Sequence, residues 1–130
     1  LMNQLISEDK NAKAEKVIDL AMEKMPVEHF GYYTLVEPFA EGYYKIGKTE
    51  KANAIVKKLI AKYQEDLTYY KSLSMGDQNG YIREIVSKIE YYKELVLITK
   101  EYDTAFFEKE KGAFNHYNKM FEYYRRKKIE

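Results

Sequence analysis

The sequence predicts an all-α chain of about six helices arranged as three antiparallel pairs. Apolar residues recur at steps of three and four over long segments, which is the spacing of one helical face. One of these patterns repeats further along the chain, and short polar or glycine-containing turns separate the patterned segments. The 130 residues are 45% hydrophobic and 33% charged, a mixture that favours one ordered domain over a disordered chain.

The repeated pattern is a stripe of apolar residues that occurs once near the start and once near the middle of the chain. The two stripes agree at all six positions at an offset of 38 residues (52 minus 14). The first consists of Ala14, Val17, Ile18, Ala21, Met22 and Met25, and the second of Ala52, Ile55, Val56, Leu59, Ile60 and Tyr63. Both segments are therefore predicted to be second helices of helix–turn–helix units.

Turn residues suggest where these helices begin and end. Gly47 suits the position just after a helix, and Thr49 is a good N-cap for the helix that follows. Pro38 disfavours helical geometry at Glu37, so the first helix of the second unit is expected to begin near that point. The residues between 27 and 35 are then interpreted as a lengthened connection.

The segment up to residue 63 resembles the tetratricopeptide repeat. A small residue and a Tyr in the first helix, an early Ala in the second and a closing Pro are typical of this family. Short side chains allow close approach of paired helices, and the Tyr fills the wedge beside them. The matching residues are Ala40, Tyr43 and Ala52 in the second repeat, and Ala14, Ala21 and Pro26 in the truncated first repeat.

The resemblance implies helical hairpins stacked as a short right-handed α-solenoid. The sequence departs from the family in its unit length, which is usually about 34 residues. It also has Leu59 where a small residue is usual, and no Pro follows Tyr63. These departures put the regularity of the second unit in doubt.

The rest of the chain is expected to complete one domain, residues 1–130. Residues 64–80 are predicted to extend the second repeat's helix and to end in a loop that contains Gly76 and Gly80. Residues 81–130 form a long terminal hairpin whose second helix starts after an Asp103 N-cap. This hairpin would cover the apolar end of the stack. Its stripes are Ile82, Ile85, Val86, Ile89, Tyr92 and Val96, then Phe106, Ala113, Phe114, Tyr117, Met120, Phe121 and Tyr124.

The order of motifs is also similar to that in the soluble C-terminal region of a bacterial family of multi-spanning membrane proteins. That family is related to membrane glycosyltransferases of the protein O-mannosyltransferase type. The resemblance rests on Met25-Pro26, on residues 38–45 (PFAEGYYK) and on residues 65–70 (EDLTYY) before the final hairpin. It implies that a membrane-embedded part precedes Leu1 and that this region faces the periplasm rather than the cytoplasm. The longest uncharged apolar run here is much shorter than a membrane-spanning helix.

No motif in the sequence indicates catalysis, a cofactor or a metal. His29 and His116 are far apart and lack metal-ligand spacing, and no Gly-rich phosphate loop is present. Glu37 and Glu41 lie one turn apart, but such pairs are frequent on charged helices. With 22 basic and 21 acidic residues, the chain has no excess charge for nucleic acid. The absence of Cys leaves the redox compartment open.

Tyrosine is the most distinctive feature, with 14 residues that include five doublets. Neighbours on a helix point about 100° apart, so one ring of each doublet is expected to pack while the other lies at the boundary. Alternatively, some rings line a recognition surface. The basic end, residues 125–128, is interpreted as complementing a helix C-terminus, with binding to anionic lipid as the alternative.

The predicted function is a non-catalytic module that binds a protein or peptide, carried by a larger membrane protein. Structural self-association of that protein and glycan binding by exposed rings are the alternatives. Tetratricopeptide-like domains bind ligands with the inner helix of each pair. The resemblance therefore implies a groove formed by Asn3, Ile6, Glu41, Tyr44 and Lys45.

Overall fold

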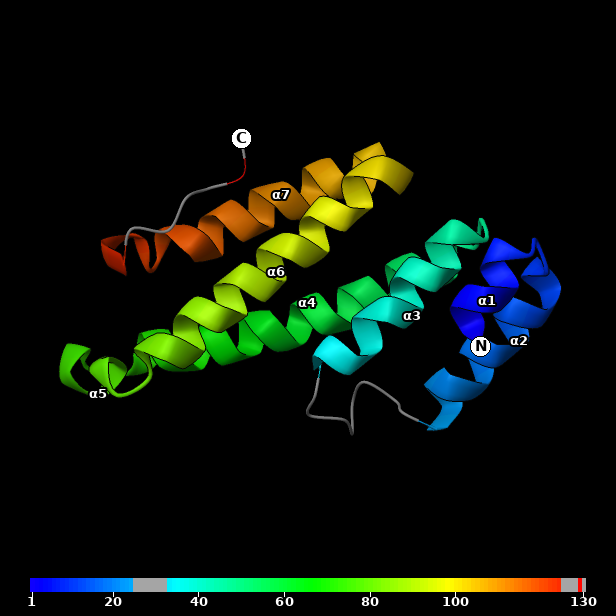
Figure 1. Cartoon of the computed structure of the whole chain (residues 1–130). Coiled ribbons are helices and arrows are strands. Elements are labelled where there is room, and N and C mark those ends of the chain that lie inside the picture. The colour runs from blue at the N-terminus through cyan, green and yellow to red at the C-terminus, as the bar shows by residue number, and fades with distance from the viewer. Residues whose placement is uncertain (25–32, 125–128, 130) are drawn as a thin grey trace. The chain divides into compact units, whose positions relative to one another are not determined.

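The computed structural model describes residues 1–24, 33–124 and 129, and these form an assembly of helices (Figure 1). No strand occurs in this part of the chain, which confirms the all-α prediction. It contains seven α-helices and a final 3₁₀ helix, η1 (Glu122–Tyr124), where six helices were predicted. The α-helices are α1 (Met2–Ser7), α2 (Asn11–Lys24), α3 (Tyr33–Lys45), α4 (Thr49–Ser72), α5 (Met75–Asn79), α6 (Ile82–Tyr102) and α7 (Thr104–Lys119).

The chain was expected to form one domain, and the structure groups it into two compact units, Leu1–Leu59 and Ile60–Glu130. The boundary falls within α4, close to residue 63, where the repeats were expected to end. None of the helices in the described ranges is long and apolar enough to cross a membrane.

In the first unit, α1 and α2 form a short hairpin, and both helices contact α3. The helices approach closely at Gly42 of α3, where a Cβ atom would lie 2.7 Å from Met2 Sδ and 3.0 Å from Ile18 Cδ1. Glycine fits here without displacing either side chain. Ala40, predicted as the small residue of this helix, is also buried, with 2% of its surface exposed.

The two repeated stripes form much of this unit's core. Ala14 and its equivalent Ala52 are each 0% exposed, and so are Ile18 and its equivalent Val56. All six residues of the second stripe are buried, although Ile60 and Tyr63 fall in the second unit. Val17, Ala21 and Met22 of the first stripe are only half-buried. Met25 and Pro26, which were expected to close the first repeat, lie outside the described residues.

The turn between α3 and α4 has the predicted glycine. Gly47 has a φ of +80°, in the region that favours glycine, and the backbone N–H of Lys48 donates to the carbonyl of Tyr43 at 2.9 Å. The Thr49 N-cap prediction was wrong by one residue. The carbonyl of Lys48 already accepts a hydrogen bond from the N–H of Ala52, so Thr49 is the first residue of α4.

Pro38 was expected to lie near the start of a helix, and this prediction was wrong. The helix α3 begins at Tyr33, so part of the predicted connection is helical and Pro38 lies inside the helix. The pyrrolidine ring of Pro38 is on the exposed side, while Val36 and Ala40 are buried on the opposite side. Packing of that apolar face outweighs the local preference of the residue before proline. Residues 25–32 of the connection lie outside the described ranges.

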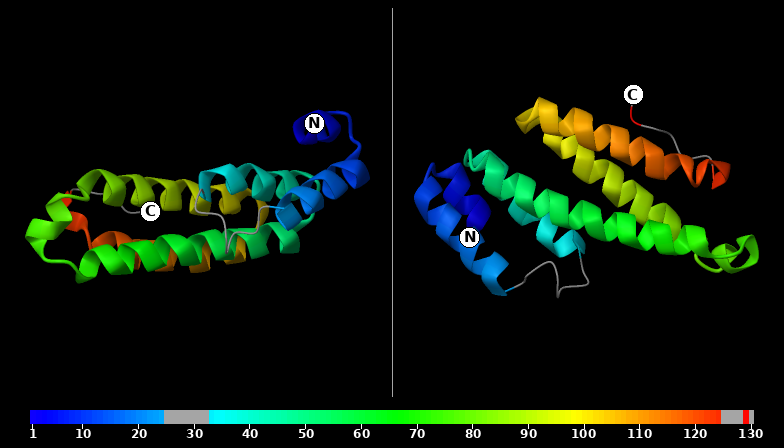
Figure 2. Two further views of the ribbon diagram at one scale, coloured as in Figure 1. Left: turned by 90° about the horizontal axis from the view of Figure 1, so that it is seen from below. Right: turned by 180° about the vertical axis from the view of Figure 1, so that it is seen from behind.

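The second unit contains the long hairpin of α6 and α7, which lie side by side in the right view of Figure 2. The predicted N-cap is confirmed, because the carboxylate of Asp103 accepts a hydrogen bond from the N–H of Phe106 at 3.0 Å. Tyr92 is at the centre of the core. It is 0% exposed, meets Phe114 edge-on with ring centroids 5.0 Å apart, and accepts a hydrogen bond from Gln64 at 2.9 Å. Ile82, predicted to belong to the same stripe, is instead exposed.

The loop predicted around residues 74–80 is instead partly helical. Ser74 caps α5 by accepting a hydrogen bond from the N–H of Asp77 at 3.1 Å. Gln78 is 2% exposed, and its amide donates to the carbonyl of Leu73 at 3.1 Å. A capping serine and a buried glutamine therefore produce one helical turn in a segment whose glycines favoured a loop.

Candidate functional site

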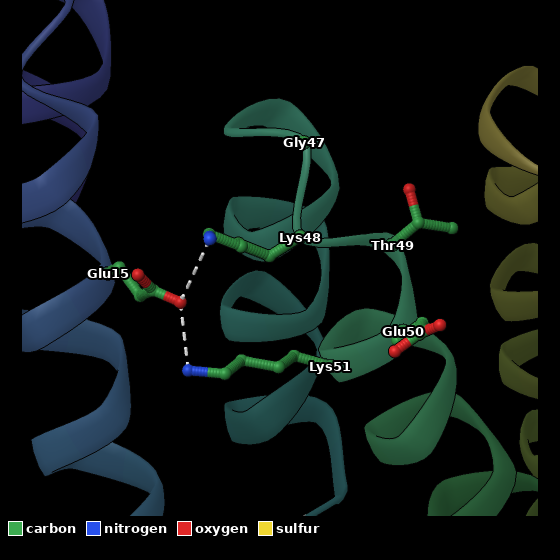
Figure 3. Close-up of a pocket in the computed structure, with 6 residues that line it drawn as sticks. All are labelled: Glu15, Gly47, Lys48, Thr49, Glu50 and Lys51. Atoms are coloured by element: carbon green, nitrogen blue, oxygen red, sulfur yellow. Dashed lines mark hydrogen bonds and ion pairs between the residues drawn. The ribbon is translucent and has the colours of Figure 1, made fainter.

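The pocket in Figure 3 lies where the α3–α4 turn faces α2, within the first unit. It is an open pocket with a volume of about 360 Å³. Gly47 shapes the turn, and the first turn of α4 follows immediately, so the side chains of Lys48 and Lys51 point toward α2 (Figure 3). The lining residues are Glu15, Gly47, Lys48, Thr49, Glu50 and Lys51.

Two lysines converge on the carboxylates of α2. Lys51 Nζ lies 2.8 Å from Glu15 Oε2 and 3.2 Å from both carboxylate oxygens of Asp19. Lys48 Nζ lies 3.7 Å from the same oxygen of Glu15 (Figure 3). Glu15 and Asp19 are one helical turn apart and share a face of α2. Opposite charges therefore largely compensate one another beside this pocket.

A buried tyrosine completes the cluster. Tyr43 of α3 is 4% exposed, and its hydroxyl donates a short hydrogen bond to Asp19 Oδ1. The ammonium of Lys51 also lies over the Tyr43 ring, 5.6 Å from its centroid. The cluster thus joins side chains from α2, α3 and α4. We call Glu15, Asp19, Tyr43, Lys48 and Lys51 the three-helix charge cluster.

Three groups of this cluster have shifted pKa values. The hydrogen bond from Tyr43, opposed by burial and aided by Lys51, lowers the pKa of Asp19. Hydrogen bonds from its ammonium to Glu15 and Asp19 raise the pKa of Lys51, and burial together with Asp19 raises the pKa of Tyr43. All three shifts move away from neutral pH. A general acid or base works best with a pKa near the working pH, and these three shifts move Asp19, Tyr43 and Lys51 away from that range.

The groove residues implied by the sequence lie on α1 and α3. Glu41 and Lys45 come together as an ion pair of 3.5 Å on α3, with both side chains about half exposed. On α1, Asn3 is exposed and Ile6 is half-buried. Since α1 contacts α3, the four residues belong to neighbouring helices. No hydrogen bond or ion pair within the described chain joins the α1 residues to the α3 pair.

Tyr44 is the exception, because its ring is buried. It is 3% exposed, and its hydroxyl donates to Asn53 Oδ1 of α4 at 2.5 Å. The expectation that one ring of each Tyr doublet lies at the boundary is therefore wrong for Tyr43 and Tyr44. The two rings point toward different neighbours, since Tyr43 faces α2 and Tyr44 faces α4, and each direction is covered. The doublet of Tyr91 and Tyr92 does follow the expectation, with 41% and 0% exposure.

The three-helix charge cluster was not predicted from the sequence, apart from Tyr43 as a packing residue. The two carboxylates one turn apart on α2 were a signal, but many such pairs exist on the chain's charged helices. Its partner lysines lie more than 30 positions further along the chain, so only the packing of α2 against the α3–α4 turn could identify them. Gly42 was also missed, although a glycine inside a helical pattern can indicate close approach.

His116 does not contribute to the site. It is exposed on α7 and meets Tyr117 edge-on, with ring centroids 5.6 Å apart. His29, Tyr32 and the basic residues 125–128 lie outside the described residues. Where the structure is described, no three His, Asp or Glu side chains are grouped so that they could hold a metal ion.

The comparisons with known proteins do not assign this chain to a family. No family model matches the chain, and no curated protein or solved structure is significantly similar to it. The tetratricopeptide resemblance and the resemblance to membrane glycosyltransferase relatives therefore stay predictions from the sequence.

Proposed function

We propose that this chain is a non-catalytic module of tetratricopeptide-like helical pairs that binds a protein or peptide segment. The observation that carries the proposal is the matched burial of the two stripes. Ala14 and Ala52, 38 positions apart, are both fully buried (52 minus 14), as are Ile18 and Val56. Stacked repeats bury a continuous core in this way because each unit packs against its neighbour.

The contacts around α3 support the same proposal. In a stack of helical pairs, the first helix of one unit meets both helices of the preceding unit. Here α3 contacts α1 and α2, and Gly42 allows close approach to both. The solvent-facing side of α1 and α3 is then the binding surface. Asn3, Ile6, Glu41 and Lys45 are the side chains that would contact the bound segment. Tyr44 supports α3 from beneath through Asn53.

A binding role also agrees with the chemistry of the three-helix charge cluster. Its carboxylates and ammonium groups are paired with one another, and the pKa values of Asp19 and Lys51 shift away from neutrality. We therefore propose that this chain acts by binding rather than by catalysis. By the sequence resemblance, it would be the C-terminal domain of a larger membrane protein and face the periplasm, with any transferase chemistry elsewhere in that protein.

The experiment is chemical cross-linking and capture from the source cell, with a charge exchange on α3. Glu41→Lys together with Lys45→Glu keeps an ion pair on the helix but reverses its direction. Capture of a specific protein by the native chain and its loss in this variant would support the groove. The matched control exchanges Glu108 and Lys111, an ion pair of 2.9 Å on α7. A partner retained by the α3 variant, or lost equally in both, would refute binding at this surface.

Self-association of the parent protein is the second candidate function. It is favoured by apolar side chains that project from the first unit, namely Leu20, 51% exposed, and Leu1, 79% exposed. Burial of such side chains between two copies would stabilise a dimer. Sedimentation velocity over a concentration series tests this, since a monomer at all concentrations would contradict it. Tyr44 is buried, so its ring is not available to stack on a sugar.

A further inference from the structure

An exposed group of tyrosines lies in the second unit, where α4 ends and α6 begins. Tyr69 is 57% exposed and Tyr81 is 41% exposed, while Tyr70 between them is half-buried. The ring centroids of Tyr69 and Tyr70 are 5.7 Å apart at an angle of 61°, and those of Tyr70 and Tyr81 are 5.3 Å apart at 40°. We call these three residues the tyrosine cluster.

The rings are inclined to one another, so they present faces in more than one direction. The negative face of an aromatic ring attracts a cation, and Tyr69 and Tyr81 are exposed enough for a cation from solvent to reach their rings. The geometry of the tyrosine cluster therefore fits a cationic group.

The same unit already contains one such interaction. The ammonium of Lys71 lies over the rings of Phe121 and Tyr123, 5.9 Å and 5.2 Å from their centroids, and donates to the carbonyl of Met120 at 3.0 Å. That aromatic pair is thus occupied by the chain itself. Within the described ranges, no lysine or arginine lies over Tyr69, Tyr70 or Tyr81.

Two carboxylates lie near the tyrosine cluster: Asp66 is one helical turn before Tyr70 on α4, and Glu84 follows Tyr81 in the first turn of α6. Burial raises the pKa of the Tyr70 hydroxyl, and these carboxylates raise it further. Asp66 is engaged by Lys88 at 3.1 Å, and Glu84 is exposed in the first turn of α6. A cation at the rings would therefore gain attraction from Glu84 in addition to the aromatic faces.

We propose that the tyrosine cluster binds an arginine side chain in a segment of a protein partner. A guanidinium is planar, stacks on tyrosine and can form paired hydrogen bonds with a carboxylate. The tyrosine faces supply the stacking surface and Glu84 supplies the carboxylate. This second contact lies in the unit Ile60–Glu130 and is separate from the α1 and α3 groove, so either can exist without the other.

The test uses the whole chain with isotope-labelled tyrosine, observed by NMR. The probe is a short acetylated and amidated peptide with two arginines among Gly and Ser residues. We expect saturable shifts of the Tyr69, Tyr70 and Tyr81 ring signals, with a dissociation constant of about 1 mM or tighter. The same peptide with citrulline, which is neutral and similar in shape, should produce none.

Variants distinguish binding at the tyrosine cluster from binding of the peptide at any exposed tyrosine. Tyr81→Leu should weaken binding at least about threefold, which is the scale of one exposed cation–π contact. Tyr91→Leu is the matched control, because Tyr91 is also 41% exposed and belongs to α6. It should bind like the native chain. Should Tyr81→Leu disturb the fold, Tyr69→Leu replaces it, and Glu84→Gln should weaken binding more at low salt than at high salt.

Three results would overturn the proposal. The first is the absence of saturable shifts up to about 10 mM peptide, well above the expected dissociation constant. The second is equal binding of the arginine and citrulline peptides, or shifts at other residues only. The third is a change of the tyrosine signals on dilution of the protein alone, which would mean that a second copy of the chain covers the cluster.

Discussion

The hydroxyl of Tyr43 on α3 donates to the carboxylate of Asp19 on α2, and the ammonium of Lys51 on α4 approaches the same carboxylate. One carboxylate therefore connects three helices. Tyr43 is also the residue that the tetratricopeptide pattern assigns to packing between helices. In this chain the ring packs while its hydroxyl forms a charge-assisted hydrogen bond, which is stronger than a bond between neutral groups.

Replacing Tyr43 with Phe keeps the ring and removes that hydrogen bond. We expect a loss of about 1 kcal/mol in the free energy of unfolding, since Asp19 is half exposed and keeps its contact with Lys51. Urea denaturation would measure the loss, and hydrogen exchange of the α2 and α3 amides would locate it. Tyr91→Phe, at an exposed position, is the control. Equal stability of the two variants would show that the bond does not hold these helices.

The ion pairs of Lys51 should contribute less than the Tyr43 hydrogen bond. The Lys51 side chain is 47% exposed, and exposed pairs are weakened by water and salt. We expect Lys51→Gln to lower stability slightly in dilute buffer and to have no effect in 1 M salt, where screening is strong. A double-mutant cycle with Glu15→Gln would isolate the 2.8 Å pair. A coupling that persists in high salt would contradict this account.

The stripes around Ala14 and Ala52 were predicted from the sequence because burial repeats along one face of a helix. The turn at Gly47 and the Asp103 N-cap were predicted from the residue types that favour these positions. In each case the signal lies within a few neighbouring residues. Local signals of this kind agree with the folded structure because packing favours the same helices and turns.

The errors arose where a distant contact outweighs a local preference. The helix α3 continues through Pro38 because its other face is buried, and Ser74 with buried Gln78 organises a helical turn where a loop was predicted. Tyr44 is buried because α4 covers it and supplies Asn53 as an acceptor. The three-helix charge cluster also depends on helix packing, so its lysines could not be assigned from spacing along the chain.

Alkaline pH should destabilise the second unit through Tyr92. Burial raises the pKa of this hydroxyl above the usual value of 10.0. A folded-state pKa above the unfolded-state pKa gives a stabilising contribution that is complete below pH 10.0 and lost as pH rises above it. The free energy of unfolding should therefore fall by up to about 1.4 kcal/mol per pH unit for this group.

Tyr92→Phe should reduce that slope, because the ionising group is removed. At neutral pH the same variant should lose about 1 kcal/mol, since Gln64 no longer has its acceptor at 2.9 Å. Urea denaturation between pH 8 and 11.5, together with ultraviolet titration of tyrosinate, measures both effects. Tyr43, Tyr70 and Tyr123 also have raised pKa values and remain in this variant, so some slope persists. An unchanged slope in Tyr92→Phe would mean that Tyr92 does not control alkaline unfolding.

Alanine at Gly42 and at Gly112 should have opposite effects on stability, although both residues lie inside helices. In a helix, alanine is usually more favourable than glycine by about 0.5–1 kcal/mol. No atom lies within 4 Å of a Cβ at Gly112, so Gly112→Ala should stabilise α7 by that amount. At Gly42 the new Cβ would lie 2.7 Å from Met2 Sδ and 3.0 Å from Ile18 Cδ1. Ile18 is fully buried and has little room to move.

We therefore expect Gly42→Ala to destabilise the first unit by about 1 kcal/mol despite the gain in helix propensity, as overpacking commonly does. Thermal and urea denaturation of both variants would show the opposite signs. Adding Met2→Ala to the Gly42→Ala variant removes the shorter contact and should recover part of the loss. If the alanine at Gly42 stabilised the chain as much as the alanine at Gly112, α3 could not lie this close to α1 and α2. The contact that supports a repeat-like stack would then be wrong.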